Sequence, residues 1–211
     1  MKYDLHTHSK YSSDGILKPE SMVKLAKKKG LSGIAVTDHN TIRGGLEAKK
    51  HETDDLKVII GSEVMTDRGE IIGLFLSEEI KATNFNEVVD EIKEQEGLVI
   101  VPHPFDLMRT SSFKLQKEDI KKIDCIEIFN SRCVNNQSNI EAAEFAKFYK
   151  LGTTGGSDAH FGHEIGNSGI TIMDEDVRKS ILNENMLVFG KRSRSINHVF
   201  TKMLKTYRKH F

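Results

Sequence analysis

Short apolar runs alternate with longer segments of helical periodicity from one end of the chain to the other. The apolar runs are rich in β-branched residues and are bounded by polar or glycine-containing segments, which is typical of buried strands. Strict alternation of strand and helix favours a mostly parallel sheet, either open or closed into a barrel. The predicted strands lie at residues 3–6, 33–37, 57–60, 70–76, 98–101, 125–129, 152–155 and 187–189.

Helix boundaries are marked by proline and glycine. Pro19 suits the first turn of a helix, and Gly30 and Gly97 suit the position just after a helix ends. We therefore predict helices between the strands, near residues 19–29, 43–51, 85–96, 117–122, 136–151 and 175–183.

The C-terminal segment carries apolar residues at helical spacing and no acidic residue from Lys191 onward. Residues 195–209 are predicted to form an amphipathic helix with a basic outer face. A basic helix of this kind could bind nucleic acid or an anionic membrane, but the basic face lacks interleaved aromatic residues. We expect residues 1–190 to form one domain and residues 191–211 to pack on its wall.

Composition supports a single globular domain. The 211 residues are 37% hydrophobic and carry 31 basic and 31 acidic side chains, so the average charge argues neither for nucleic acid nor for an acidic partner. The N-terminal residues lack a basic and then apolar signal pattern, and no apolar run approaches the length of a membrane span. We expect a cytoplasmic protein without a membrane partner or an obligate protein partner.

Polar clusters follow the predicted strands at one end of the sheet. Barrel enzymes build their sites from the carboxyl ends of parallel strands, where the connecting loops converge. We expect the other histidines, at positions 51, 163, 198 and 210, to be surface or structural residues. The clusters are His6-Thr7-His8, Asp38-His39-Asn40, Ser62-Glu63, His103-Pro104, Asn130-Ser131-Arg132 and Ser157-Asp158-Ala159-His160.

Two of these clusters repeat the same spacing. Residues two apart in a strand point to one side, so His6 and His8 converge, and Asp158 and His160 do the same. Imidazole and carboxylate are common ligands of zinc, manganese and iron. Each residue also has an ordinary structural interpretation. Together, at the ends of alternating strands, they predict a metal site, which would be completed by His39, Glu63 and His103.

These motifs resemble the PHP superfamily, which is named for a domain of bacterial polymerases and histidinol phosphatases. The resemblance extends from about residue 4 to residue 171. It implies a distorted barrel of seven β/α units with two or three divalent metal ions, usually manganese, zinc or iron, that hydrolyses phosphoesters. It rests on Asp4-Leu5-His6-Thr7-His8-Ser9 with Ser13-Asp14-Gly15, Thr37-Asp38-His39-Asn40, Gly61-Ser62-Glu63, Pro102-His103-Pro104 and Gly156-Ser157-Asp158-Ala159-His160.

Carried over to this sequence, the family pattern gives each metal its ligands. His6, His8, Glu63 and Asp158 would hold the first metal. Glu63 would bridge to a second metal that His103 also binds.

Asp14, His39 and His160 would hold the third metal by the same resemblance. The family often has a further histidine on the second metal, whereas this chain has Glu70 in that place. Glu70 is either a ligand or a solvated strand residue. As a ligand it would shift the preference toward manganese or iron, because a carboxylate is a harder donor than imidazole.

A metal cluster of this kind has a defined chemistry. A water that bridges two metals is deprotonated near neutral pH, and the resulting metal-bound hydroxide attacks phosphorus in line with the leaving oxygen. The catalytic centre would then consist of His6, His8, Asp158 and His160. Arginine matches phosphate bidentately, and Arg109 and Arg132 both follow predicted strands, so both are candidates to bind the substrate phosphate.

The sequence therefore predicts a hydrolase of phosphomonoesters, and the compact form of the chain resembles the nucleotide-phosphatase and exonuclease-like members. Its substrate would be a small phosphorylated molecule, a nucleotide or the end of a short oligonucleotide. Two alternatives stay open. Amidohydrolases also begin with His-x-His, although they generally bridge their metals with a modified lysine that has no counterpart here. The second alternative is a metal-stabilised regulatory module without catalytic activity. The presence of almost the whole ligand set argues against it.

Overall fold

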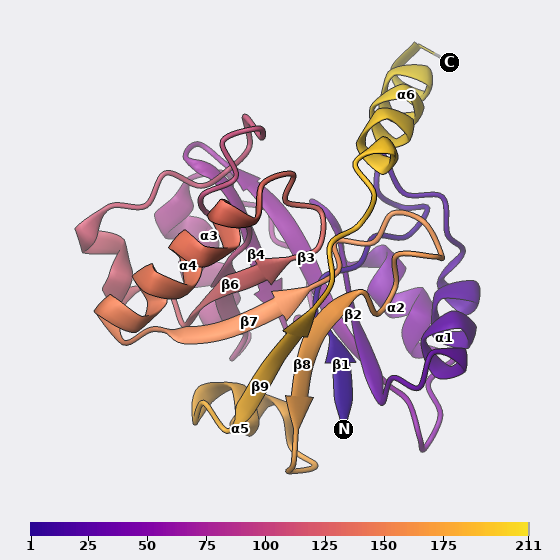
Figure 1. Ribbon diagram of the computed structural model, residues 1–211, viewed down its shortest axis with the longest axis horizontal. Coiled ribbons are helices and arrows are strands. Elements are labelled where there is room, and N and C mark those ends of the chain that lie inside the picture. Colours follow the sequence, from indigo (N-terminus) through magenta and orange to yellow (C-terminus); the bar gives the residue numbers. More distant parts are fainter. Residues whose placement is uncertain (211) are drawn as a thin grey trace.

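A nearly closed, barrel-shaped sheet dominates the computed structural model, which describes the backbone of residues 1–210 and the side chains of residues 1–208 (Figure 1). The strands in this part of the chain are β1 (Lys2–Asp4), β2 (Gly33–His39), β3 (Lys57–Thr66), β4 (Gly69–Leu74), β5 (Leu98–Val101), β6 (Cys125–Asn130), β7 (Gly152–Gly156), β8 (Ser168–Ile172) and β9 (Met186–Gly190). They pair in the order β7-β6-β5-β4-β3-β2-β1-β8-β9. The α/β barrel predicted from the sequence is confirmed.

The prediction of a mostly parallel sheet is wrong for part of the barrel. β1, β2 and β3 are parallel to one another, as are β5, β6 and β7, but β4 is antiparallel to both of its neighbours. β3 and β4 form a hairpin in which Thr66 pairs with Gly69, so no helix reverses the chain between them. β3 is also longer than predicted and contains Glu63, which the sequence pattern placed beyond the strand end.

Sequence patterns did not predict β8. This strand lies antiparallel to β1, where Tyr3 pairs with Ile170, and it forms a hairpin with β9. The hairpin lies between β1 and β7, and Gly155 of β7 packs closely against it. A Cβ atom added at Gly155 would lie 2.7 Å from the Val188 side chain of β9 and 3.1 Å from the carbonyl oxygen of Gly169 in β8. The extra hairpin therefore occupies the space between β1 and β7, and the described residues form nine strands where the sequence pattern predicted eight.

Helices flank this sheet on its outer side. Asn84 and Asn135 cap the helices that follow them, because each side-chain oxygen accepts a hydrogen bond from the backbone N–H two residues later. The segment 117–121 is a 3₁₀ helix and not the predicted α-helix. The α-helices of the described chain are α1 (Pro19–Lys28), α2 (Arg43–Lys49), α3 (Phe85–Glu94), α4 (Asn136–Tyr149), α5 (Val177–Leu182) and α6 (Ile196–His210).

An apolar core fills the barrel below its polar end. Ile59 and Glu63 are four residues apart in β3, and Cys125 and Glu127 are two apart in β6, so each pair lies on one face of its strand. Ile59 and Cys125 belong to the same buried apolar cluster, while both glutamates are buried among polar residues. Within two to four residues, the inward-facing side chains of these strands thus change from apolar to polar.

The predicted C-terminal helix is present as α6 (Ile196–His210). Among the side chains of residues 196–208, Asn197 and Thr201 are buried, whereas Val199, Phe200 and Met203 are exposed. Polar side chains therefore face the barrel, and α6 projects away from the sheet in Figure 1. The side chains of Lys209 and His210, and Phe211 as a whole, lie outside the described residues.

None of the helices within residues 1–210 combines the length and the apolar character that crossing a membrane requires.

Candidate metal centre

His6 and His8 lie in an extended segment that continues β1. Thr7 between them is fixed on both sides, because its carbonyl accepts from Thr37 N–H at 2.8 Å and it forms a parallel bridge with Ala159. Fixing Thr7 in this way directs both imidazoles to one side. Their Nε2 atoms lie 3.1 Å apart and both rings are buried, as the alternation of an extended chain predicts.

Asp158 and His160 follow β7 and lie beside the first histidine pair. The bridge between Thr7 and Ala159 places the two motifs side by side, and the Asp158 Oδ1 atom lies 3.4 Å from His8 Nε2. Asp158 has a φ of 55°, in the left-handed region that few residues other than glycine adopt. Such backbone strain is concentrated at functional sites.

Glu63 lies at the centre of the cluster. Its Oε2 atom is 3.5 Å from His6 Nε2, 3.4 Å from His8 Nε2 and 3.2 Å from His39 Nδ1. Its other oxygen, Oε1, lies 3.0 Å from His103 Nε2. One carboxylate therefore faces two groups of imidazoles, as a bridging ligand does.

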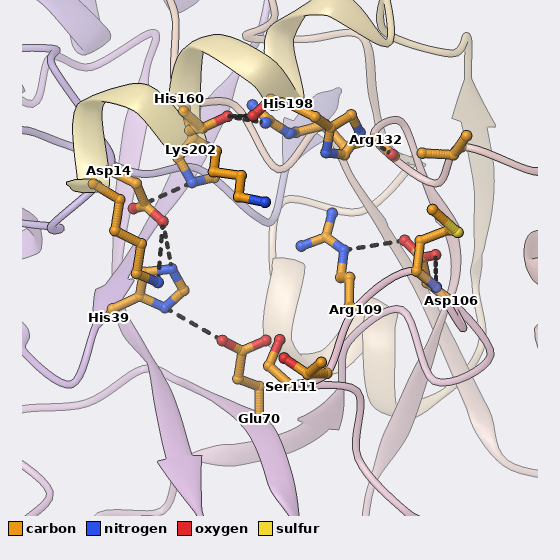
Figure 2. Close-up of a pocket in the computed structure, with 15 residues that line it drawn as sticks. Asp14, His39, Glu70, Asp106, Arg109, Ser111, Arg132, His160, His198 and Lys202 are labelled. Carbon is orange, nitrogen blue, oxygen red and sulfur yellow. Dashed lines mark hydrogen bonds and ion pairs between the residues drawn. The ribbon is translucent and has the colours of Figure 1, made fainter. Parts of the chain in front are cut away.

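A further group forms at the mouth of the barrel. Asp14 lies in the loop after the first histidine pair, with Oδ1 at 3.3 Å from His160 Nε2 and Oδ2 at 3.3 Å from His39 Nε2 (Figure 2). The two nitrogens of the His39 ring thus face different carboxylates, because Nδ1 is directed to Glu63. His39 lies between two of the three predicted metal positions.

Glu70 reaches the cluster because β4 runs antiparallel. Its position near the start of β4 lies at the same end of the barrel as the carboxyl ends of the parallel strands. Its oxygens lie 3.7 Å from His39 Nδ1 and 3.8 Å from His103 Nε2. Burial and the neighbouring Glu63 raise the pKa of Glu70. A solvated strand residue is therefore excluded, and a role for Glu70 as a ligand stays a prediction.

Two buried carboxylates to which the sequence reasoning assigned no role support the ligands. Glu127 contacts His6 Nδ1 at 3.1 Å and accepts from the backbone N–H of His103 at 3.0 Å. Asp38 accepts from the N–H and the hydroxyl of Ser9 at 2.6 and 2.7 Å. The available signal for Glu127 was an acidic residue inside an otherwise apolar strand, which is rarely tolerated without a specific partner.

Gly156 allows β7 to approach the first histidine. A Cβ atom at this position would lie 2.2 Å from the Cβ of His6 and 2.7 Å from the Glu127 carboxylate. No side chain fits there without moving the buried pair.

The contacts of the outer ring nitrogens of His6 and His8 determine which nitrogen carries the hydrogen when the rings are neutral. His6 Nδ1 faces the Glu127 carboxylate, which only accepts. His8 Nδ1 lies 3.1 Å from Ser12 Oγ, whose proton is donated to Asp38. In the neutral rings each Nδ1 therefore carries the hydrogen, and both Nε2 lone pairs point into the same space.

The other nitrogen and oxygen atoms of the cluster also fit the binding of divalent cations. The described residues provide no hydrogen-bond partner for three buried atoms of the cluster, Asp14 Oδ1, Asp158 Oδ1 and His103 Nδ1. Imidazole nitrogens and carboxylate oxygens at this spacing match the ligand chemistry of zinc, manganese and iron. Four overlapping groups have ligand atoms within 4.8 Å of one another: His8, Asp14, His39 and His160; His6, His8 and Asp158; His6, Glu63 and His103; and His39, Glu63 and Glu70.

The buried carboxylates and the neighbouring histidines shift the pKa values of His6 and His8. Burial alone would lower the pKa of His6, but the carboxylates of Glu127 and Glu63 raise it well above its ordinary value. Burial and the neighbouring His160 lower the pKa of His8 to about 3. The negative charge of the buried carboxylates thus holds a proton on His6, which is positive charge that a metal ion would replace.

The two arginines predicted to bind phosphate differ in their surroundings. Arg109 lines the cavity and donates to Asp158 Oδ2 at 2.5 Å and to Asp106 Oδ2 at 3.1 Å. Arg132 also lines it but is buried, and its guanidinium is engaged by Glu164 and Thr201. Arg109 is therefore the more accessible of the two guanidinium groups, and a role in phosphate binding stays a prediction for both.

The cluster opens into a cavity of about 470 Å³ that also involves the C-terminal helix. Lys202 and Lys205 of α6 line it, and so does His198, which the sequence pattern did not associate with the site (Figure 2). His198 is held by the carbonyl of Arg132 at 2.7 Å. The motif-based prediction could not find these residues, because the helix is far from the ligand motifs in sequence.

Comparison with curated proteins gives several archaeal relatives. The chain is 37% identical over 185 residues to the uncharacterized protein MJ0417 of Methanocaldococcus jannaschii, a match that covers 85% of this chain and 73% of that protein. It is 45% identical over 144 residues to the uncharacterized protein MJ1587 of the same organism, which covers 62% of this chain and 82% of that one. A shorter match of 78 residues, 41% identical, is to a 5'-3' exoribonuclease of Haemophilus influenzae and covers 35% of this chain and 28% of that enzyme.

Solved structures share the fold. A two-domain protein from Bacteroides vulgatus, described as containing a predicted PHP-like metal-dependent phosphoesterase, matches with a TM-score of 0.74 and 20% identity over 96% of this chain and 69% of that one. A putative metal-dependent phosphoesterase from Bifidobacterium adolescentis matches with a TM-score of 0.68 and 17% identity over 87% of this chain and 96% of that one. The family model of the PHP domain matches residues 4–208. The chain therefore belongs to the PHP domain family.

Proposed function

We propose that this protein is a metal-dependent hydrolase that cleaves phosphomonoesters. The observation that carries the proposal is the convergence of buried imidazole nitrogens and carboxylate oxygens from separate strands. Among the described residues, Asp14 Oδ1 and Asp158 Oδ1 have no hydrogen-bond partner. Divalent metals bound there would lower the pKa of a water molecule and neutralise charge on the phosphoryl oxygens. Such a site needs no nucleophile from the protein.

The proposed ligand assignment follows the spacing of the cluster. His6, His8, Glu63 and Asp158 would hold one metal ion, and Glu63 would share a second with His103. Asp14 and His160 would bind a third. His39 faces both of the latter positions, since its two nitrogens point to different carboxylates, and Glu70 would contribute to the second.

Arg109 would bind the phosphoryl group. Its Nε and Nη2 atoms are held by Asp106 and Asp158, so the guanidinium is oriented before the substrate arrives. Asp106 and Asp158 also raise the pKa of Arg109 against the effect of burial, so it stays charged. A pre-oriented cation loses little entropy on binding phosphate and can stabilise charge in the transition state.

A nucleotide or the end of a short oligonucleotide is the proposed substrate. This is supported by the partial similarity to an exoribonuclease and by a cavity large enough to hold more than a phosphate group. The first experiment measures metal content of protein purified without chelator and phosphatase activity toward a chromogenic phosphoester and nucleotides with added manganese. Turnover that is lost in His8→Ala and Asp158→Ala supports the proposal. Full metal content without turnover would instead indicate a metal-stabilised regulatory module.

A further inference from the structure

Polar contacts determine where α6 lies on the barrel. Asn197 and Thr201 of this helix are buried, whereas Val199 is 51% exposed and Met203 is 63% exposed. Burial of apolar surface therefore contributes little to the attachment of the helix. The position of α6 depends instead on the buried polar groups that it contacts.

Glu164 joins this helix to the loop that carries His160. Its side chain is fully buried, and its Oε1 atom accepts a hydrogen bond from the side-chain amide of Asn197 in α6 at 2.7 Å. Its Oε2 atom accepts from the backbone N–H of His160 at 3.1 Å and from that of Phe161 at 3.2 Å. One carboxylate thus holds both the helix and the backbone of a candidate metal ligand.

Arg132 completes this connection. Its Nη1 atom lies 3.1 Å from Glu164 Oε2, and its Nη2 atom donates to the Thr201 hydroxyl of α6 at 2.5 Å. Its carbonyl oxygen lies 2.7 Å from Nε2 of His198, on the same helix. Because a buried charge that loses its partner is strongly destabilising, Glu164 and Arg132 fix the rotation of α6 about its axis.

The far end of α6 contacts the loop that carries Asp14. Arg208 Nη1 donates to the carbonyl oxygen of Ser12 at 2.7 Å. The hydroxyl of Ser12 accepts from the backbone N–H of His39 at 2.9 Å, and Asp14 follows two residues later in the loop. The helix is therefore connected at one end to the loop of His160 and at the other to the loop of Asp14.

These two loops meet at the third proposed metal position. Asp14 Oδ1 lies 3.3 Å from His160 Nε2, and Asp14 Oδ2 lies 3.3 Å from His39 Nε2 (Figure 2). Asp14 and His160 are far apart in the sequence, so their separation in space depends on how their loops are held. α6 spans both loops and keeps the ligands of one metal ion close together.

We propose that Glu164 is a positioning residue that couples the packing of α6 to the binding of the third metal ion. This inference rests on the proposed function, which assigns that ion to Asp14, His39 and His160. Coupling between two equilibria is reciprocal. The third metal therefore binds more tightly when α6 is packed, and α6 is held more firmly, by the same factor, when the metal is bound.

Hydrogen exchange of the full chain, measured by mass spectrometry with manganese and with a chelator, tests the coupling. In the wild type, the backbone amides of residues 197–208 should exchange about tenfold more slowly with manganese. Glu164→Gln keeps the size of the side chain but replaces one acceptor oxygen with an amide that donates. It should abolish this difference and weaken the binding of one manganese ion about 10- to 100-fold in isothermal titration. Glu144→Gln, on the exposed face of α4, should behave as the wild type does.

Thr201→Val tests the same coupling from the helix. It keeps the shape of the side chain and removes the hydroxyl that Arg132 contacts, so it should reduce both effects. This variant also provides the test if Glu164→Gln does not fold. A Glu164 with a purely structural role would lower the protection of α6 by the same factor with and without manganese, which would overturn the proposal.

Two further outcomes would overturn it: wild-type exchange in α6 that does not respond to manganese, or a response that survives in both variants. A chromogenic phosphatase assay on the same samples separates this proposal from the hydrolase. Turnover without a metal-dependent change in α6 would refute the coupling alone. A metal-dependent change without turnover would support the coupling and refute the hydrolase.

Discussion

The Nδ1 atom of His6 lies 3.1 Å from the Oε1 atom of Glu127, and the other oxygen of Glu127 accepts from the backbone N–H of His103. One buried carboxylate thus orients two candidate ligands that come from different strands. Carboxylates in this position fix the tautomer of a metal-binding histidine and increase its basicity.

Replacing Glu127 should weaken metal binding without removing a ligand. In Glu127→Gln the amide keeps the size of the side chain but lacks the charge, so His6 is less well oriented and less basic. We expect manganese affinity to fall about 10- to 100-fold, measured by isothermal titration. Glu144→Gln, on the exposed face of α4, is the control and should bind as the wild type does. Equal affinity in both variants would contradict the supporting role of Glu127.

Metal removal should destabilise the protein. Glu63 and Asp158 are buried close together, and a cation between them reduces their mutual repulsion. A metal at 100 times its dissociation constant stabilises the fold by about 2.7 kcal/mol for one site. For a chain of this size that corresponds to a rise in Tm of about 5 to 11 °C.

Differential scanning calorimetry with manganese and with a chelator measures this shift. Asp158→Asn should show a smaller difference between the two conditions than the wild type, because one charged ligand is lost. If the chelator leaves the wild-type Tm unchanged, then the cluster does not bind metal under those conditions.

The ligand motifs could be predicted because each one is local. A pair such as His6 and His8 needs only the alternation of an extended segment to converge, and the ends of parallel strands bring separate pairs together. The sequence placed Glu63 with the other candidate ligands although its strand was predicted too short. Its neighbours depend on the strand register, which pairs it with His39, and not on where the strand ends.

The remaining parts of the site depend on contacts that no local pattern contains. Glu127 supports its partners from within a strand, and its role is visible only once His6 lies opposite. The helix α6 could be predicted, but the apolar spacing does not indicate which of its faces is buried. That choice is made by Arg132 and Glu164, which contact the helix through Thr201 and Asn197.

Glu70 provides a test of metal preference. Its carboxylate lies 3.7 Å from His39 Nδ1 and 3.8 Å from His103 Nε2, at one end of the second proposed position. In Glu70→His, imidazole replaces a harder oxygen donor, so the affinity for zinc relative to manganese should rise by about tenfold. Competition titrations monitored by elemental analysis measure this ratio. An unchanged preference would show that Glu70 is a buried strand residue and not a ligand.

Arg68 and Asp119 should contribute to stability through contacts that involve none of the candidate ligands. The two terminal nitrogens of Arg68, Nη1 and Nη2, donate to the two carboxylate oxygens of Asp119 at 2.8 and 2.5 Å. The guanidinium group also lies over the rings of Phe85 and Phe113. Lysine reproduces neither the forked geometry nor the planar stacking. Arg68→Lys should lower the free energy of unfolding by about 1.5 to 3 kcal/mol, measured by urea denaturation.

The same pair predicts a pH dependence. Burial would raise the pKa of Asp119, but the hydrogen bonds from Arg68 and from the backbone of Gln116 lower it below its ordinary value. A carboxyl group with a lowered pKa in the folded state stabilises the protein above its unfolded pKa of about 3.9 and loses this effect as the pH falls. The difference in stability between the wild type and Asp119→Asn should therefore be full at pH 7 and shrink in acid below about pH 4. A difference that stays constant down to pH 2 would show that packing, and not the charge of Asp119, accounts for the effect.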